Sequence, residues 1–70
     1  MGLFRAIEYA TKEFLFCYHG LRYMKYRDNS LEKAEVHLTK AIKSGREFIG
    51  LGGYVSSEER NLLKVLENSI

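Results

Sequence analysis

The first 27 residues carry apolar side chains at alternating spacings of four and three, the pattern of an α-helix rather than a strand. The pattern predicts one long helix over residues 3–27, roughly 37 Å in length at about 1.5 Å per residue. Its main apolar line is sustained over three heptads, which indicates packing against a neighbouring helix of the same chain. The positions of this line are Leu3, Ile7, Ala10, Phe14, Cys17, Leu21 and Met24.

A second line of aromatic residues runs along another side of the same predicted helix. Tyr9, Phe16 and Tyr23 recur every seven residues, and Phe4 and Tyr18 lie beside the main line. Two shorter helices can cover one side of a helix this long, but hardly both sides. We therefore expect these aromatic residues to meet another chain, because an exposed aromatic surface typically marks an interface. The alternative is that they pack against the third helix and the C-terminal residues.

A second helix is predicted over residues 30–49. Asn29 or Ser30 can cap its exposed backbone amides, and Asn29 with Glu32 fits a capping box. Gly45 lies inside this helix, where glycine is unfavourable, and so predicts a bend or a close helix contact. The apolar positions on one face are Leu31, Ala34, Leu38, Ala41, Ile42, Phe48 and Ile49.

A third helix is predicted over residues 56–69. The glycine-rich stretch Gly50–Gly53 ends the second helix, since glycine takes the left-handed conformation of a helix C-terminus without steric cost. Ser56 and Glu59 form the S-x-x-E capping box that opens the third helix. The chain is therefore expected to be all-α, a small three-helix up-down-up bundle in one domain over residues 1–70. Its apolar positions in the third helix are Leu62, Leu63, Val65 and Leu66.

The stretch Gly20–Ser44 resembles a single tetratricopeptide-type helix pair. Arg22 stands where such a repeat has a small residue, and the repeat's terminal proline is missing. Because one unit cannot stack into a solenoid, the resemblance implies a packed helical hairpin and no more. The residues that carry it are Leu21, Tyr26, Leu31, Ala34 and Ala41.

A chain of 70 residues builds only a small core, burying roughly 60% of its unfolded surface. Small domains compensate with disulfides, a metal, regular helix packing or oligomerisation. Cys17 is the only cysteine, which excludes an internal disulfide, and His19 and His37 have no second ligand at helical spacing. We therefore expect no metal and no cofactor. Regular packing and a homo-oligomer, a dimer or higher, remain.

No segment of the sequence suggests a membrane or a secretory route. The longest apolar run, Phe14–Tyr18, has five residues, whereas a bilayer span needs about 20. Glu8, Lys12 and Glu13 interrupt any apolar region that a secretory signal would need. Together with the single thiol, this predicts a cytoplasmic protein.

The formal net charge is only +2, but basic residues gather at the end of the first helix. Arg22, Lys25, Tyr26 and Arg27 interleave basic and aromatic side chains, as do surfaces that stack single-stranded nucleic acid. This patch suggests a second hypothesis, that the protein binds nucleic acid or a small anionic ligand. Such binding would be weak and strongly dependent on salt. The structural alternative is that these cations complement the negative end of the helix dipole.

Other motifs are weaker. Gly50–Gly53 lacks the lysine and the Ser or Thr that follow the last glycine of a P-loop. A helix-turn-helix formed by the second and third helices would offer only Arg60, Asn61 and Lys64 for reading bases. No nucleophile–base–acid set can be placed, so we predict that the protein is not an enzyme.

The leading hypothesis is therefore a small helical interaction protein, an adaptor, regulator or inhibitor. It would self-associate and bind a partner protein. The residues predicted to form its interface are Phe4, Tyr9, Phe16, Tyr18 and Tyr23.

Overall fold

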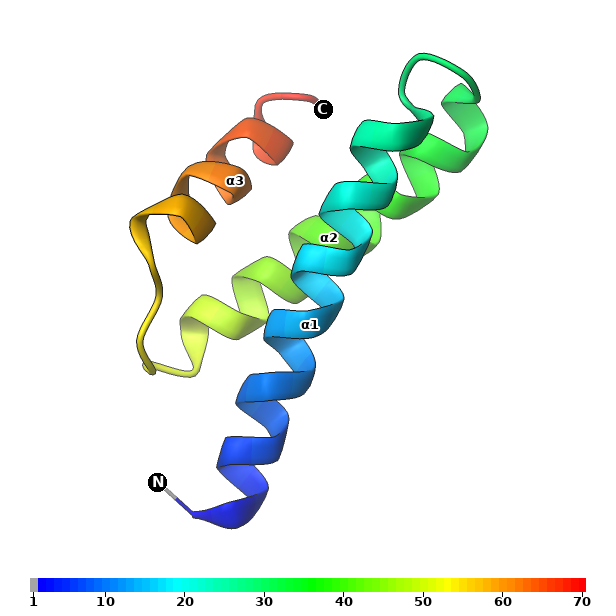
Figure 1. The fold of residues 1–70 in the computed structure, drawn as a ribbon. Coiled ribbons are helices and arrows are strands. Elements are labelled where there is room, and N and C mark those ends of the chain that lie inside the picture. Colours follow the sequence, from blue (N-terminus) through cyan, green and yellow to red (C-terminus); the bar gives the residue numbers. More distant parts are fainter. Residues whose placement is uncertain (1) are drawn as a thin grey trace.

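The computed structural model describes residues 2–70, and within that range it contains three α-helices and no strand. Helix α1 spans Leu3–Tyr26, α2 spans Leu31–Gly50 and α3 spans Ser57–Glu67. The chain reverses at each turn, so that α1 and α2 form a closely packed hairpin and α3 lies beside it (Figure 1). This confirms the all-α, three-helix fold that the sequence predicts.

The turn between α1 and α2 is set by Ser30. Its side chain accepts a hydrogen bond from the backbone amide of Lys33, at 3.5 Å, and so caps the first turn of α2. The Asn29 side chain instead donates to the carbonyl oxygen of Lys25, at 3.2 Å. The expected capping box of Asn29 with Glu32 is therefore wrong, because Asn29 closes the end of α1 while Ser30 opens α2.

The turn between α2 and α3 has the features that the sequence predicts. Gly52 has φ +79°, a left-handed conformation in which a side chain would be strained. The backbone amide of Glu59 donates to the Ser56 hydroxyl and the backbone amide of Ser56 donates to the Glu59 carboxylate, both at 3.1 Å. This reciprocal pair is a capping box, and it fixes the start of α3.

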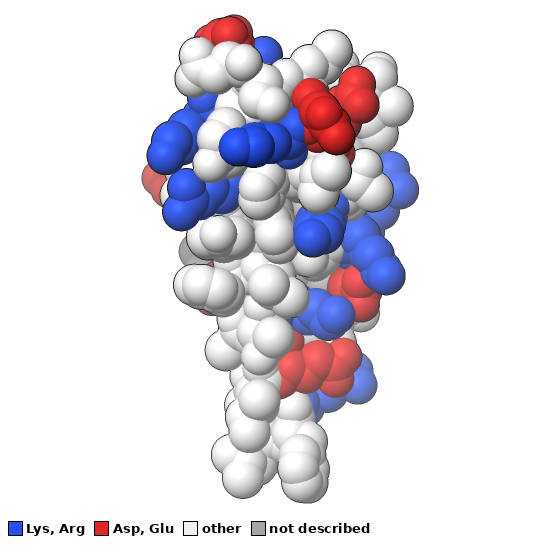
Figure 2. All heavy atoms as spheres, turned by 90° about the vertical axis from the view of Figure 1, so that its right-hand side faces the viewer, with Lys and Arg blue, Asp and Glu red and all other residues white. Residues whose placement is uncertain are grey.

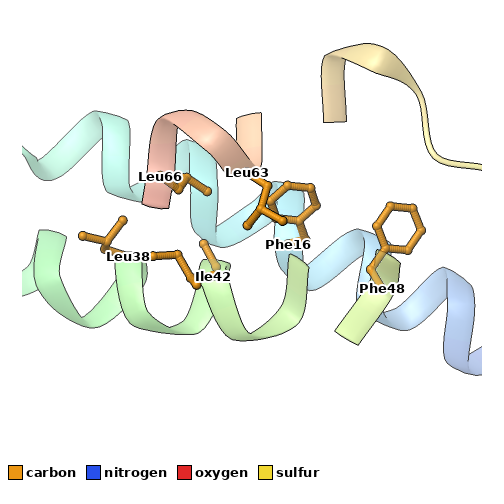
Figure 3. Close-up of a cluster of buried hydrophobic side chains, with 7 residues drawn as sticks. Phe16, Leu38, Ile42, Phe48, Leu63 and Leu66 are labelled. Atoms are coloured by element: carbon orange, nitrogen blue, oxygen red, sulfur yellow. The ribbon is translucent and has the colours of Figure 1, made fainter. Parts of the chain in front are cut away.

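The core lies where the three helices meet (Figure 3). Phe16 from α1, Phe48 from α2 and Leu66 from α3 are the largest side chains with no exposed surface. The ring centroids of Phe16 and Phe48 are 6.3 Å apart. The remaining buried side chains of this cluster are Leu38, Ala41, Ile42 and Leu63.

The aromatic line that was expected on the surface faces this core. Phe16 is completely buried, and Tyr9 and Tyr23 are partly buried against the core cluster. The Tyr9 ring packs on Phe48 with centroids 4.9 Å apart, and its hydroxyl donates to the carbonyl oxygen of Tyr54. The prediction of a surface stripe is therefore wrong. The aromatic residues pack within the chain, as the alternative expected, but mainly against α2 rather than against the third helix and the C-terminal residues.

Gly45 explains why Phe16 fits. A Cβ atom at Gly45 would lie 2.8 and 2.9 Å from two Phe16 ring carbons and 3.1 Å from a Leu63 methyl carbon. The ring therefore rests on the backbone of α2, at a distance that only glycine permits. The close helix contact expected at this glycine is present.

This contact yields a stability prediction. Gly45→Ala gains about 1 kcal/mol in helix propensity, but overpacking a core typically costs about 1–3 kcal/mol. Because the Phe16 ring is enclosed and cannot swing away, we expect the free energy of unfolding to fall, measured by urea denaturation. Gly50→Ala is the matched control, since no atom lies within 4 Å of its Cβ position, and it should leave stability equal or higher. A stabilised Gly45→Ala variant would contradict this packing.

Candidate interaction surfaces

The side of α1 that faces away from the core is apolar and exposed. At about 100° per residue, this side lies opposite Phe16 around the helix axis. We call it the apolar face of α1. Its residues and their exposed fractions are Leu3 74%, Phe4 86%, Ile7 55%, Phe14 65%, Tyr18 39% and Leu21 67%.

This face contains most of the heptad line that the sequence analysis assigned to packing within the hairpin. That assignment is wrong for Leu3, Ile7, Phe14 and Leu21, which are exposed, while Cys17 is half-buried at the edge of the line. The physical reason is the contact of Phe16 with α2, which rotates α1 so that its aromatic line points inward. Of the five residues predicted to form an interface, only Phe4 and Tyr18 lie on the exposed face.

The N-terminal turns of α1 project beyond the other two helices (Figure 1). Every residue from Gly2 to Glu8 is exposed. Gly2 supplies no side-chain cap, and the first turn carries no acidic residue to offset the helix dipole. A short helical end without a cap or packing is marginal in water, so this overhang gains most from an external contact.

A second surface lies at the opposite end of the hairpin, where imidazoles and phenols pack together. The Nδ1 atoms of His19 on α1 and His37 on α2 are 2.9 Å apart, a hydrogen bond in which one ring donates to the other. The Tyr26 ring stacks on His37 with centroids 5.7 Å apart and nearly parallel planes. Tyr18 meets both imidazoles edge-on, with centroids 5.1 and 6.3 Å away.

Cations surround these rings. The Arg22 guanidinium lies 5.3 Å from the centroid of the Tyr18 ring. The ammonium groups of Lys25 and Lys33 lie 5.6 and 5.4 Å from the centroid of Tyr26. Figure 2 shows several Lys and Arg side chains in the upper part of this side of the molecule, with Asp and Glu side chains beside them, whereas its lowest part is uncharged. We call the basic–histidine cluster the set His19, Arg22, Lys25, Lys33, His37 and Lys40, with Tyr18 and Tyr26.

The cluster includes most of the basic patch predicted from sequence. Arg22, Lys25 and Tyr26 belong to it. Arg27 instead lies in the turn, where its Nε atom is 4.0 Å from a carboxylate oxygen of Asp28. The α2 residues Lys33, His37 and Lys40 were missed. Only the antiparallel register of α1 and α2 brings them beside α1, and no local pattern in the sequence signals it.

Both histidines are held neutral by their surroundings. Burial lowers the pKa of His19 and His37 below the usual value for histidine. The positive charge of Lys40 lowers the pKa of both rings further, and Arg22 lowers that of His37. The pair is therefore mostly uncharged at neutral pH.

Cys17, Glu13 and Glu59 are further titratable groups with shifted pKa values, on α1 and α3. Burial raises the pKa of the Cys17 thiol, and the carboxylates of Glu59 and Glu13 raise it further, so the thiol stays protonated. A hydrogen bond to Glu59 raises the pKa of Glu13. In the part of the chain that the structure describes, no three His, Cys, Asp or Glu residues are grouped to hold a metal ion. Over the same residues no helix is long and apolar enough to cross a membrane.

No protein-family model, no curated protein and no solved structure matches this chain.

The lowered histidine pKa values predict a specific pH dependence of stability. Below about pH 6.5 the unfolded chain takes up protons that the folded histidines resist, so the free energy of unfolding falls as the pH falls. His19 and His37 are the only histidines. We expect the melting temperature of the wild type to drop more steeply between pH 7.5 and 5.5 than that of the double variant His19→Gln/His37→Gln, followed by circular dichroism. Parallel pH profiles for the two proteins would contradict the assignment.

Proposed function

We propose that this protein is a small helical interaction protein that self-associates through the apolar face of α1. Its wider role is that of an adaptor, regulator or inhibitor of a partner protein, and it acts by association rather than by catalysis. The single observation that carries the proposal is the continuous exposure of large apolar side chains along α1, opposite the side that builds the core. Contiguous apolar surface of this kind marks interfaces on soluble proteins.

The spacing of the face favours a second copy of the chain as its occupant. Leu3, Ile7, Ala10 and Phe14 follow the alternating steps of four and three of a coiled-coil seam, and Leu21 follows one heptad after Phe14. A seam with this period packs best against another helix with the same period. Neither α2 nor α3 covers it, because both lie on the Phe16 side of α1. A second copy of α1 presents the matching seam.

The area of the face is that of a stable interface. Taking roughly 200 Å² for the full surface of a large apolar side chain, the exposed fractions of its six residues amount to about 800 Å² per copy. A standard specific interface buries about 800 Å² on each partner. The face is therefore large enough for a dimer without contributions from α2 or α3.

Charge and symmetry favour an antiparallel pair. Arg22 and Lys25 lie near one end of α1, and a parallel arrangement would place four positive charges close together across the two copies. An antiparallel arrangement centred on Phe14 separates the two copies of each cation by about 24 Å or more, given roughly 1.5 Å of rise per residue. It also lays the unsupported overhang of one copy along the C-terminal turns of α1 in the other. Phe14, close to the centre of α1, would then meet its symmetry mate.

The first test is the oligomeric state. We expect sedimentation equilibrium to show a dimer at micromolar concentration, and Phe14→Glu to shift the protein to a monomer because a carboxylate would be buried at the centre of the interface. Val65→Glu is the matched control, since Val65 is also an exposed apolar residue but lies on α3. It should leave the dimer intact. A wild-type chain that is monomeric at high micromolar concentration would rule out the self-association.

The second test is the orientation. In an antiparallel dimer Ile7 of one copy lies near Leu21 of the other, whereas in a parallel dimer each faces its own counterpart. Ile7→Glu and Leu21→Lys should each be monomeric alone and should form a heterodimer when mixed, because the new charges then pair. Light scattering of the mixture at low salt measures this. A mixture that stays monomeric would exclude the antiparallel arrangement.

A further inference from the structure

We infer that the basic–histidine cluster is a binding site for a tetrahedral oxyanion, phosphate or sulfate in its chemistry, whose binding is coupled to protonation of the histidine pair. This site lies at the turn end of the α1–α2 hairpin, and it borders the seam of the proposed dimer through Tyr18, Arg22 and Lys25. It is a second function of the same fold, and it does not depend on self-association.

The first argument is uncompensated charge. Among residues 2–70 the ion pairs are Lys12 with Glu47, Arg27 with Asp28 and Arg46 with Glu67. None of the four cations of the cluster, Arg22, Lys25, Lys33 and Lys40, takes part in them. Two of these side chains come from each helix of the hairpin, so folding brings like charges together. A doubly charged anion among them would offset that repulsion and form charge-assisted hydrogen bonds.

The second argument is the chemistry of the imidazole pair. The hydrogen bond between the Nδ1 atoms leaves the two Nε2 atoms for other partners. In the neutral pair one Nε2 carries a hydrogen and the other only a lone pair. Uptake of one proton gives both Nε2 atoms a hydrogen, so the pair changes from one donor and one acceptor to two donors. It also places a positive charge beside the anion, which stabilises the complex.

The third argument is space and ligand type. A groove of about 290 Å³ adjoins the cluster and is lined by Lys33, His37, Ser30, Val36 and Glu32. Because Glu32 in this lining is acidic, the anion is expected against Lys33 and His37. Tyr26 already stacks on His37 and has two ammonium groups over its ring. This leaves little aromatic surface for a nucleobase, which favours recognition of the oxyanion itself over stacking of bases.

Sulfate is the sharpest probe, because it stays doubly charged throughout the pH range in which the histidines titrate. We expect titration with sodium sulfate at constant ionic strength, followed through the histidine ring proton resonances, to give a saturable shift. The affinity should be at least threefold higher at pH 6.0 than at pH 7.5, and bound sulfate should raise the pKa of the pair. The charged groups that control this response are Arg22 and Lys25 on α1, and Lys33, Lys40 and Glu32 on α2.

Matched variants separate a site from general charge screening. The double variant Lys33→Gln/Lys40→Gln should weaken sulfate binding by about fivefold or more, whereas Lys64→Gln, which removes a cation from α3, should leave it unchanged. Ile7→Glu should also bind sulfate normally, so that loss of the dimer and loss of the anion site are distinguished. Shifts that are linear in concentration, equal for chloride or independent of pH would overturn the proposal.

Two further probes identify the source of the oxyanion. Pyrophosphate represents a small ligand, and a short single-stranded oligonucleotide represents a phosphodiester backbone. Tighter binding of pyrophosphate than of the oligonucleotide would assign the site to a small phosphate-bearing ligand. The reverse order, lost in Lys33→Gln/Lys40→Gln, would assign the same oxyanion site to a nucleic-acid backbone.

Discussion

The contact of the Phe16 ring with the backbone of α2 at Gly45 determines the rest of the structure. It fixes how close α1 and α2 approach, and it fixes the rotation of α1 about its own axis. Once Phe16 points inward, Tyr9 and Tyr23 must follow at the same helical spacing, and the seam through Phe14 must point outward. Core packing and surface chemistry are thus set by the same interaction, because a helix cannot turn one face without turning the other.

The same rotation places the second surface. His19 lies three residues after Phe16 and so reaches the side of α1 that borders α2, where it meets His37. The antiparallel register then brings Lys33 and Lys40 up to residues near the end of α1. An apolar seam on one side and a cationic cluster at one end are therefore both consequences of how α1 seats on α2. α3 contributes mainly by closing the core with Leu63 and Leu66 and by the ion pair of Glu67 with Arg46.

Local chemistry made much of the fold predictable. Ser56 with Glu59, the glycines after α2 and the periodicity of each segment located the helices to within two residues of their observed ends. The rotation of α1 was not predictable, because two apolar lines compete for the core and both have the right period. The choice depends on a glycine 29 positions away in sequence that accepts a ring in place of a Cβ. The α2 residues of the basic–histidine cluster, Lys33, His37 and Lys40, could not be predicted from the sequence either, because they lie next to α1 only after folding.

The four-residue connection between α1 and α2 also bears on the order of folding. Helices joined by so short a turn make contacts between residues close in sequence, and such local contacts form quickly. α3, by contrast, reaches the hairpin after a longer loop and is anchored by few side chains, so we expect it to dock last and to open first. Until it docks, Leu63 and Leu66 are absent from one side of the Phe16 ring. The α1–α2 hairpin alone therefore leaves Phe16 incompletely covered. Of the two helices with side-chain caps, α2 and α3, the backbone amides of α3 should exchange with solvent faster.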